Sequence, residues 1–149
     1  MEKKPLIIGS DHAGYELKNR LVPWMQKKGI SVEDAGVNAP TAVDYPDIGY
    51  AVAIRVADGR FARGILLCGT GVGMSCVANK VKGIRAGLCG DSYTARSSRE
   101  HNDTNILVLG ARVIGDQLAM EIVETWLNTS FLGDRHQRRV EKIHTLTGR

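Results

Sequence analysis

Short apolar runs alternate with helical patterns along the whole sequence, and this alternation limits the folds open to the chain. Runs rich in β-branched and other apolar residues predict strands at 6–9, 30–33, 64–68, 84–88 and 105–109. Helical patterns lie at 12–28, from about 47, at 74–79, 92–100 and 116–128, and from about 134. Because successive parallel strands are joined by right-handed crossovers, we expect a Rossmann-like three-layer α/β/α sandwich with a five-stranded parallel sheet.

The size and composition fit one domain. A chain of 149 residues can bury a substantial core, and its contents of 43% hydrophobic and 24% charged residues are ordinary for a globular protein. We therefore expect a single domain over 1–149 that ends in a helix at about 134–147. No apolar run is long enough to span a bilayer, and no secretory signal precedes the first predicted strand, so we expect a cytoplasmic protein.

The charge is modestly positive and concentrated near the end of the sequence. The net charge is +4, and the segment 134–149 holds four arginines and one lysine. Aromatic residues make up only 5% of the chain, whereas nucleic-acid-binding proteins usually combine a wider basic surface with stacking aromatics. Nucleic acid is thus not an expected partner. The basic segment is either an anion site for a small molecule or a solvated helix face.

The cysteines and histidines favour neither a disulfide framework nor a metal site. Cys68, Cys76 and Cys89 are odd in number and lack CxxC spacing, and the four histidines show no ligand motif. Cys76 and Cys89 lie in apolar surroundings, so we expect both to be core thiols.

Cys68 differs because a glycine-rich loop follows it directly. Gly69, Gly71 and Gly73 alternate with other residues, Thr70 lies between the first two, and a helical pattern begins near Met74. Such a loop brings backbone amides close to a ligand, and a thiol beside these donors suits proton removal next to a carbonyl. The loop matches neither GxGxxG nor the GK[ST] phosphate loop, so nucleotide binding is disfavoured.

Other polar residues follow the predicted strands at the same edge of the sheet. Asp11-His12, Asp44-Tyr45, Asp91 and Arg112 all lie beyond carboxyl ends, where open α/β sheets bind ligands.

His101 precedes the last predicted strand and so belongs to the opposite edge of the sheet. It either caps and turns the chain together with Asn102, or it faces the site of a neighbouring subunit. Arg135 and Arg139 are four positions apart and share a helix face, which suits phosphate binding as well as a plain solvated surface.

Several motifs together resemble one known family. They are Gly9-Ser-Asp-His-Ala-Gly14, Asp44-Tyr-Pro46, Cys68-Gly-Thr-Gly-Val-Gly73, Ala78-Asn-Lys80, Gly83-Ile-Arg85, His101-Asn-Asp-Thr-Asn105, Gly110-Ala-Arg-Val113 and Gly133-Asp-Arg-His-Gln-Arg-Arg139. In this order they resemble the B-type ribose-5-phosphate isomerases, a group that includes allose- and galactose-6-phosphate isomerases. The resemblance spans nearly the whole chain.

The resemblance implies a role for each matching residue. Cys68 would move a proton between C1 and C2 of the open-chain sugar. Thr70 and the amides of Gly69, Gly71 and Gly73 would hold the enediolate. His101 would open the sugar ring, with Asp11 nearby. Tyr45 and Asn102 would contact the sugar. The phosphate would be bound by His12, Arg112, Arg135 and Arg139. Some relatives place a glutamate where this chain has Met74, which cannot take a proton, so Cys68 is the only candidate base.

The resemblance also implies partners and activity. It implies a homodimer with shared active sites and the C-terminal helix near the subunit interface; further pairing into tetramers is left open. No cofactor or metal is implied. We expect interconversion of ribose 5-phosphate and ribulose 5-phosphate through an enediolate, in the pentose phosphate pathway. The alternatives are an isomerase of a hexose 6-phosphate, such as allose or galactose 6-phosphate, and a non-catalytic sugar-phosphate-binding module.

Overall fold

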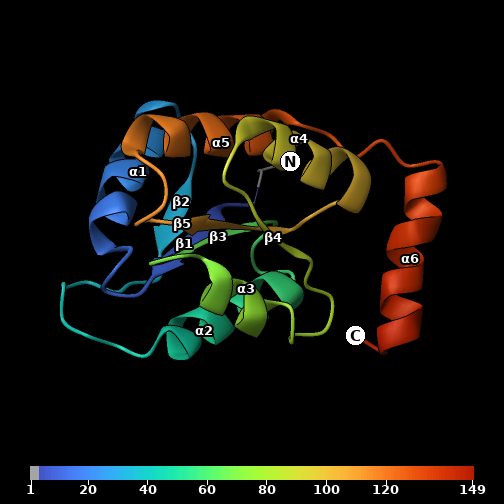
Figure 1. Ribbon diagram of the computed structural model, residues 1–149, viewed down its shortest axis with the longest axis horizontal. Helices are drawn as coiled ribbons and strands as arrows, with labels where there is room; N and C mark the ends of the chain where they lie inside the picture. Colours follow the sequence, from blue (N-terminus) through green and yellow to red (C-terminus); the bar gives the residue numbers. More distant parts are fainter. Residues whose placement is uncertain (1–3) are drawn as a thin grey trace.

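A five-stranded parallel sheet forms the centre of the protein (Figure 1). The structure is a computed structural model and describes residues 4–149. In chain order the strands are β1 (Leu6–Ser10), β2 (Val32–Asp34), β3 (Gly64–Cys68), β4 (Ala86–Leu88) and β5 (Ile106–Gly110). Their spatial order is β2-β1-β3-β5-β4, and every neighbouring pair is parallel. The predicted sheet is confirmed.

The three inner strands are buried along their full length, whereas the two edge strands are short and partly exposed. A strand covered by helices on both faces needs apolar side chains on both sides, which explains the continuous runs of β1, β3 and β5. Gly64 pairs with Ile106 and Cys68 with Gly110, so β3 and β5 end together at one edge.

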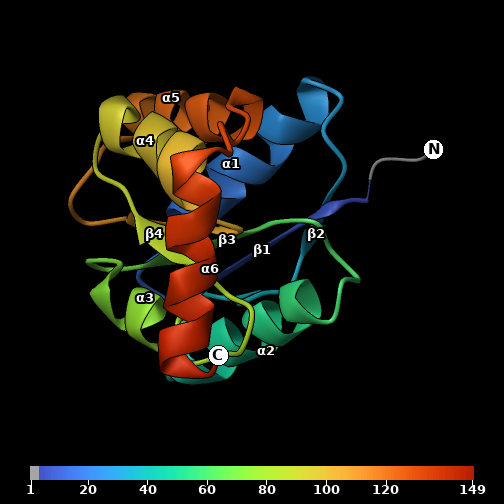
Figure 2. The same ribbon diagram turned by 90° about the vertical axis from the view of Figure 1, so that its right-hand side faces the viewer.

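Helices cover both faces of the sheet (Figure 1). They are α1 (Tyr15–Lys27), α2 (Tyr45–Ala57), α3 (Val72–Ala78), α4 (Ser92–Asn102), α5 (Asp116–Asn128) and α6 (Arg135–Thr147). One core cluster joins α1, α4 and α5 to one face, and a second joins α2 and α3 to the other. The predicted three-layer sandwich is thus confirmed. α6 stands at the side of the sandwich and packs against α4 (Figures 1 and 2).

Two helices begin earlier than their apolar patterns predict. α2 begins at Tyr45 rather than at about 47, because Asp44 is extended and Pro46 occupies the first turn. Proline lacks a backbone N–H, but amides of the first helical turn have no partner within the helix, so none is lost there. α3 begins at Val72 rather than 74, because Gly71 has a left-handed conformation with φ 82° that ends the preceding loop. In both cases the capping geometry, and not the hydrophobic spacing, fixes the first helical residue.

The prediction that Cys76 is a core thiol is wrong, because its side chain is exposed, whereas Cys89 is buried as expected. Met74 and Ala78 are the buried residues of α3 and lie four positions apart on the face towards the sheet. Cys76 lies midway between them in sequence and therefore points away from the sheet.

The chain shows no membrane-spanning helix over residues 4–149: none of its helices is both long and apolar enough for a bilayer.

Candidate functional site

Cys68 ends β3 at the carboxyl edge of the sheet. It is buried, and its carbonyl oxygen accepts a hydrogen bond from the Ala111 amide at 2.9 Å. β3 lies between β1 and β5 at the centre of the sheet. The thiol is therefore carried by the central strand of the sheet, and the chain leaves the sheet immediately after it.

The loop after Cys68 passes very close to its neighbours. A Cβ atom added to Gly71 would lie 2.4 Å from Cδ1 of Leu88, and one on Gly110 would lie 2.6 Å from the carbonyl oxygen of Thr70. The Thr70 hydroxyl accepts a hydrogen bond from the Val72 amide at 3.2 Å. Only residues without side chains allow the backbone to pack this tightly.

Several amides of this loop are free to bind an anion. Across the part of the chain that the structure describes, the amides of Gly69, Thr70, Gly71 and Gly73 donate to no protein acceptor. They lie directly beyond Cys68, where developing negative charge on a carbonyl oxygen can be held by preorganised donors. The arrangement can therefore stabilise an oxyanion beside a thiol.

Tyr45 covers the loop from the start of α2. A Cβ atom on Gly73 would lie 2.7 Å from the Tyr45 ring, so the ring rests directly on the glycine backbone. Tyr45 is 40% exposed and presents the rest of its surface to solvent. Its contact with a sugar stays a prediction.

Asp11 and His12 follow β1 at the same edge. The buried Asp11 carboxylate accepts the Gly14 amide at 3.1 Å, and the Asp11 amide donates to the carbonyl of Leu67 in β3. Nδ1 of His12 accepts the Val43 amide at 3.3 Å, which fixes the His12 ring against the loop that leads to α2.

Arg112 completes this edge from the end of β5. Its amide donates to the Gly69 carbonyl at 2.9 Å, and its Nη1 lies 3.4 Å from where a Gly69 Cβ would be. The predicted residues Asp11, His12, Tyr45, Gly69 and Arg112 are thus brought together around Cys68.

The other predicted site residues lie elsewhere on this chain. α4 returns across the sheet and ends at Asn102, shortly before β5 starts at Ile106. Ile106 pairs with Gly64, and Cys68 lies about 13 Å further along β3 at about 3.3 Å per residue. His101 and Asn102 are therefore at the amino edge of the sheet, and Arg135 and Arg139 are exposed on the neighbouring α6.

His136 is a residue of this second group that sequence reasoning did not assign. Its ring stacks on His101 with centroids 4.3 Å apart and planes 12° apart, which joins α4 to α6. His136 is buried, and its Nε2 has no hydrogen-bond partner on the described chain. Burial, and then the charges of His101, Arg135 and Arg139, lower the pKa of His136 below its usual value. In the sequence, His136 lies four positions before the apolar Val140, a spacing that places both on one helix face and so indicates that His136 is buried.

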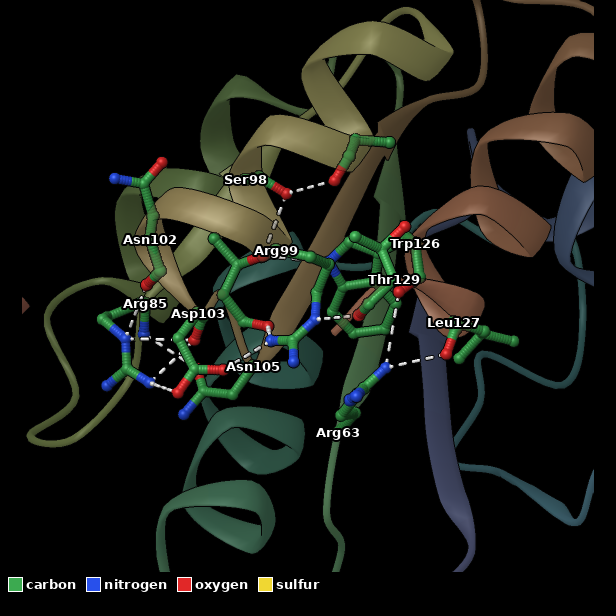
Figure 3. Close-up of polar contacts among 12 residues, drawn as sticks. Arg63, Arg85, Ser98, Arg99, Asn102, Asp103, Asn105, Trp126, Leu127 and Thr129 are labelled. Carbon is green, nitrogen blue, oxygen red and sulfur yellow. Dashed lines mark hydrogen bonds and ion pairs between the residues drawn. The ribbon is translucent and has the colours of Figure 1, made fainter. Parts of the chain in front are cut away.

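Arginines fix the end of α4, as Figure 3 shows. Arg85 and Arg99 both contact the carboxylate of Asp103, which follows Asn102 directly. Nε of Arg85 also donates to the Asn102 carbonyl at 3.0 Å. The backbone that carries His101 and Asn102 is thus tied to β4 and to its own helix.

Residues 4–149 contain no cluster of three or more His, Cys, Asp or Glu side chains that could hold a metal ion. The edge around Cys68 offers a thiol, the carboxylate of Asp11, the guanidinium of Arg112 and backbone amides.

Comparisons with known proteins show what the whole chain is similar to. The family described as Ribose/Galactose Isomerase matches residues 6–143. Ribose-5-phosphate isomerase B of Escherichia coli is 46% identical, over 98% of each chain. The D-erythrulose-4-phosphate isomerase of Pectobacterium atrosepticum is 47% identical, over 93% of this chain and 91% of the relative.

Solved structures extend the likeness to three dimensions. Ribose-5-phosphate isomerase B of Clostridium thermocellum is 52% identical, with a TM-score of 0.95 over 97% of each chain. The enzyme from Thermotoga maritima is 48% identical, with a TM-score of 0.92 over 95% of this chain and 98% of that one. Together with the family match, these likenesses confirm the resemblance drawn from the motifs: the chain belongs to the ribose/galactose isomerase family.

Proposed function

We propose that this protein interconverts ribose 5-phosphate and ribulose 5-phosphate. The observation that carries the proposal is the position of Cys68, held at the end of β3 beside free amides of the loop over 69–73. The ribose-5-phosphate isomerases B among its relatives support the choice of a pentose phosphate.

Proton transfer by Cys68 gives the reaction. The thiolate takes the proton from C2 of the open-chain aldose, and the electron pair moves to form an enediolate. The same proton returns to C1, while the proton of the C2 hydroxyl passes to the C1 oxygen, so no atom is gained or lost. The amides of Gly69, Gly71 and Gly73, with the Thr70 hydroxyl, hold the enediolate oxygens.

The other groups open and anchor the sugar. His101 protonates the ring oxygen and receives the proton of the C1 hydroxyl, and Asp11 is its polar partner. His12, Arg112, Arg135 and Arg139 bind the phosphate, since guanidinium groups suit bidentate contacts with it. Tyr45 and Asn102 line the sugar. Binding energy from the remote phosphate then positions the reacting carbons.

Such a site needs two copies of the chain. His101, Asn102, Arg135 and Arg139 lie at the opposite edge of the sheet from Cys68, so we propose a homodimer in which each site combines one edge from each subunit. α6 stands outside the sandwich and exposes Ile143 and Leu146, which supports its place at the subunit interface. The domain over 1–149 is then the repeating unit of the assembly.

Turnover of sugar phosphates by the purified protein tests the function. We expect ketose formation from ribose 5-phosphate, with kcat/KM higher than for allose 6-phosphate, galactose 6-phosphate or erythrose 4-phosphate. A hexose or tetrose phosphate that is preferred would replace the pentose assignment. Binding of sugar phosphates without any turnover would replace the enzyme by a binding module.

The thiol itself is tested by substitution. Cys68→Ala should lower kcat by roughly 10²–10⁴-fold, because the base is lost. Cys76→Ala is the matched control: this thiol is exposed on α3, and its loss should change kcat by no more than about twofold. Full activity of Cys68→Ala would overturn the mechanism.

A further inference from the structure

Asp103 occupies an unusual place at the end of α4. It follows Asn102 and has a left-handed backbone with φ 47°, a conformation that aspartate and asparagine adopt more readily than most other residues. Its amide donates to the Arg99 carbonyl, so it closes the helix that carries His101. The direction in which His101 and Asn102 face is therefore coupled to the conformation of Asp103.

Two arginines hold the Asp103 carboxylate from different elements, Arg99 buried and Arg85 partly buried (Figure 3). Nη1 of Arg99, on α4 itself, lies 2.8 Å from Oδ1, and Nη2 of Arg85, next to β4, lies 3.3 Å from Oδ2. The Arg99 side chain is only 6% exposed and that of Arg85 17%. Within residues 4–149, Asp103 is the only carboxylate within 4 Å of either guanidinium.

Arg85 also binds the backbone at this turn and reaches α6. Its Nε donates to the carbonyls of Asn102 and Asp103 at 3.0 and 3.1 Å, and its Nη2 donates to the Asp103 carbonyl at 2.7 Å. Its Nη1 lies 2.8 Å from Nε2 of His144 on α6. One guanidinium thus connects the end of α4 with the helix that stacks His136 on His101.

The Asp103 carboxylate offsets the positive charge of the arginines around this turn. The Arg63 guanidinium lies 5.4 Å from the centroid of the Trp126 ring, and among residues 4–149 it donates only to the carbonyls of Trp126 and Leu127. Burial lowers the pKa of Arg63 and of Arg85, and the charge of Arg99 lowers both further, whereas Asp103 raises both. The guanidinium groups of Arg85 and Arg99 therefore share one carboxylate, whose charge also acts on Arg63. Without it, Arg85 and Arg99 repel each other across the turn.

We propose that Asp103, held by Arg85 and Arg99, is a positioning residue for His101 and Asn102. It acts through the backbone at the end of α4 and does not touch the substrate. The inference rests on the proposed function, because it assigns Asp103 to the half of the site that opens the sugar ring.

Asp103→Asn tests this role, since asparagine keeps the left-handed backbone but removes the charge. Ribose 5-phosphate exists mainly as a furanose, whereas erythrose 4-phosphate cannot close such a ring because its C4 oxygen carries the phosphate. Poor placement of His101 therefore penalises the turnover of ribose 5-phosphate more than that of erythrose 4-phosphate. We expect kcat/KM to fall about tenfold or more for ribose 5-phosphate and less than about threefold for erythrose 4-phosphate.

A matched control and a mixing experiment separate positioning from general damage. Glu124→Gln removes a carboxylate from an exposed ion pair with Lys28 and should leave the ratio of kcat/KM for the two sugar phosphates unchanged. Asp103→Asn mixed with Cys68→Ala should regain activity, because one hybrid site is then intact. Asp103→Asn mixed with His101→Ala should show no gain, since both changes damage the same half.

Spectroscopy tests the placement without any turnover. In Asp103→Asn, we expect the His101 imidazole resonances to shift and the amides at the end of α4 to exchange faster with solvent, unlike in Glu124→Gln. Unmoved His101 resonances would overturn the proposal, as would equal losses of kcat/KM for ribose 5-phosphate and erythrose 4-phosphate. If the wild-type protein turned over no sugar phosphate, the proposed function would fail, and this measurement would still decide the placement of His101 by Asp103.

Discussion

Tyr45 and Gly73 lie so close that residue 73 has no room for a side chain. A Cβ atom there would lie 2.7 Å from the ring, below the distance of ordinary contacts. Gly73→Ala should therefore displace Tyr45 from the loop and lower kcat/KM about tenfold or more. Gly115→Ala is the matched control, because a Cβ atom there meets no atom within 4 Å. Steady-state kinetics of both variants check the prediction, and equal activities would contradict it.

Cys89 is the thiol that the fold keeps protonated. Burial raises its pKa from 9.0 to about 11, so the unfolded chain loses this proton at lower pH than the native protein does. Its contribution to stability is therefore present below pH 9 and is lost as the pH rises towards 11. When the pH is raised from 8 to 10, the unfolding free energy of both proteins should fall. We expect this fall to be about 1 kcal/mol smaller in Cys89→Ala than in the wild type. Denaturant unfolding at both pH values measures this, and equal losses would contradict it.

At the scale of the element, α6 is held by contacts that respond to acid. Burial lowers the pKa of His136 in the folded protein, so the unfolded chain binds a proton more readily. The stability that neutral His136 contributes is present above its unfolded pKa and is lost as the pH falls through that value. His136→Phe keeps a flat ring against His101 but cannot titrate. We expect its melting temperature to fall less than that of the wild type between pH 7.5 and 5.5, and a parallel decline would contradict this.

Elements also differ in how far the sequence predicts them. The strands β1, β3 and β5 were predicted within one residue at each end, because full burial on both faces leaves an uninterrupted apolar run. The edge strands β2 and β4 are less apolar, and two of the predicted residues at the start of each lie outside the strand. Helix starts at Tyr45 and Val72 depend on a proline and a left-handed glycine, which hydrophobic spacing does not report.

At the scale of the whole molecule, the shared site makes a quantitative prediction. If each site combines Cys68 of one subunit with His101 of the other, a hybrid of Cys68→Ala and His101→Ala has one intact and one doubly damaged site. Equal mixing gives half hybrids, so the mixture should regain about a quarter of wild-type activity after subunit exchange. Mass spectrometry of the mixed dimers verifies the exchange. No recovery despite exchange would place the complete site within one subunit.

The sequence by itself determined the sheet, its two helical layers and the groups that meet around Cys68. These follow from local patterns, because strand ends in a parallel sheet collect on one edge whatever the loops do. Only the tertiary structure decided which side of α3 Cys76 occupies, that His136 stacks on His101, and that Arg85 and Arg99 close on Asp103. These contacts join elements far apart in the chain. Their geometry depends on how helices pack against one another, which the apolar pattern of each element does not specify.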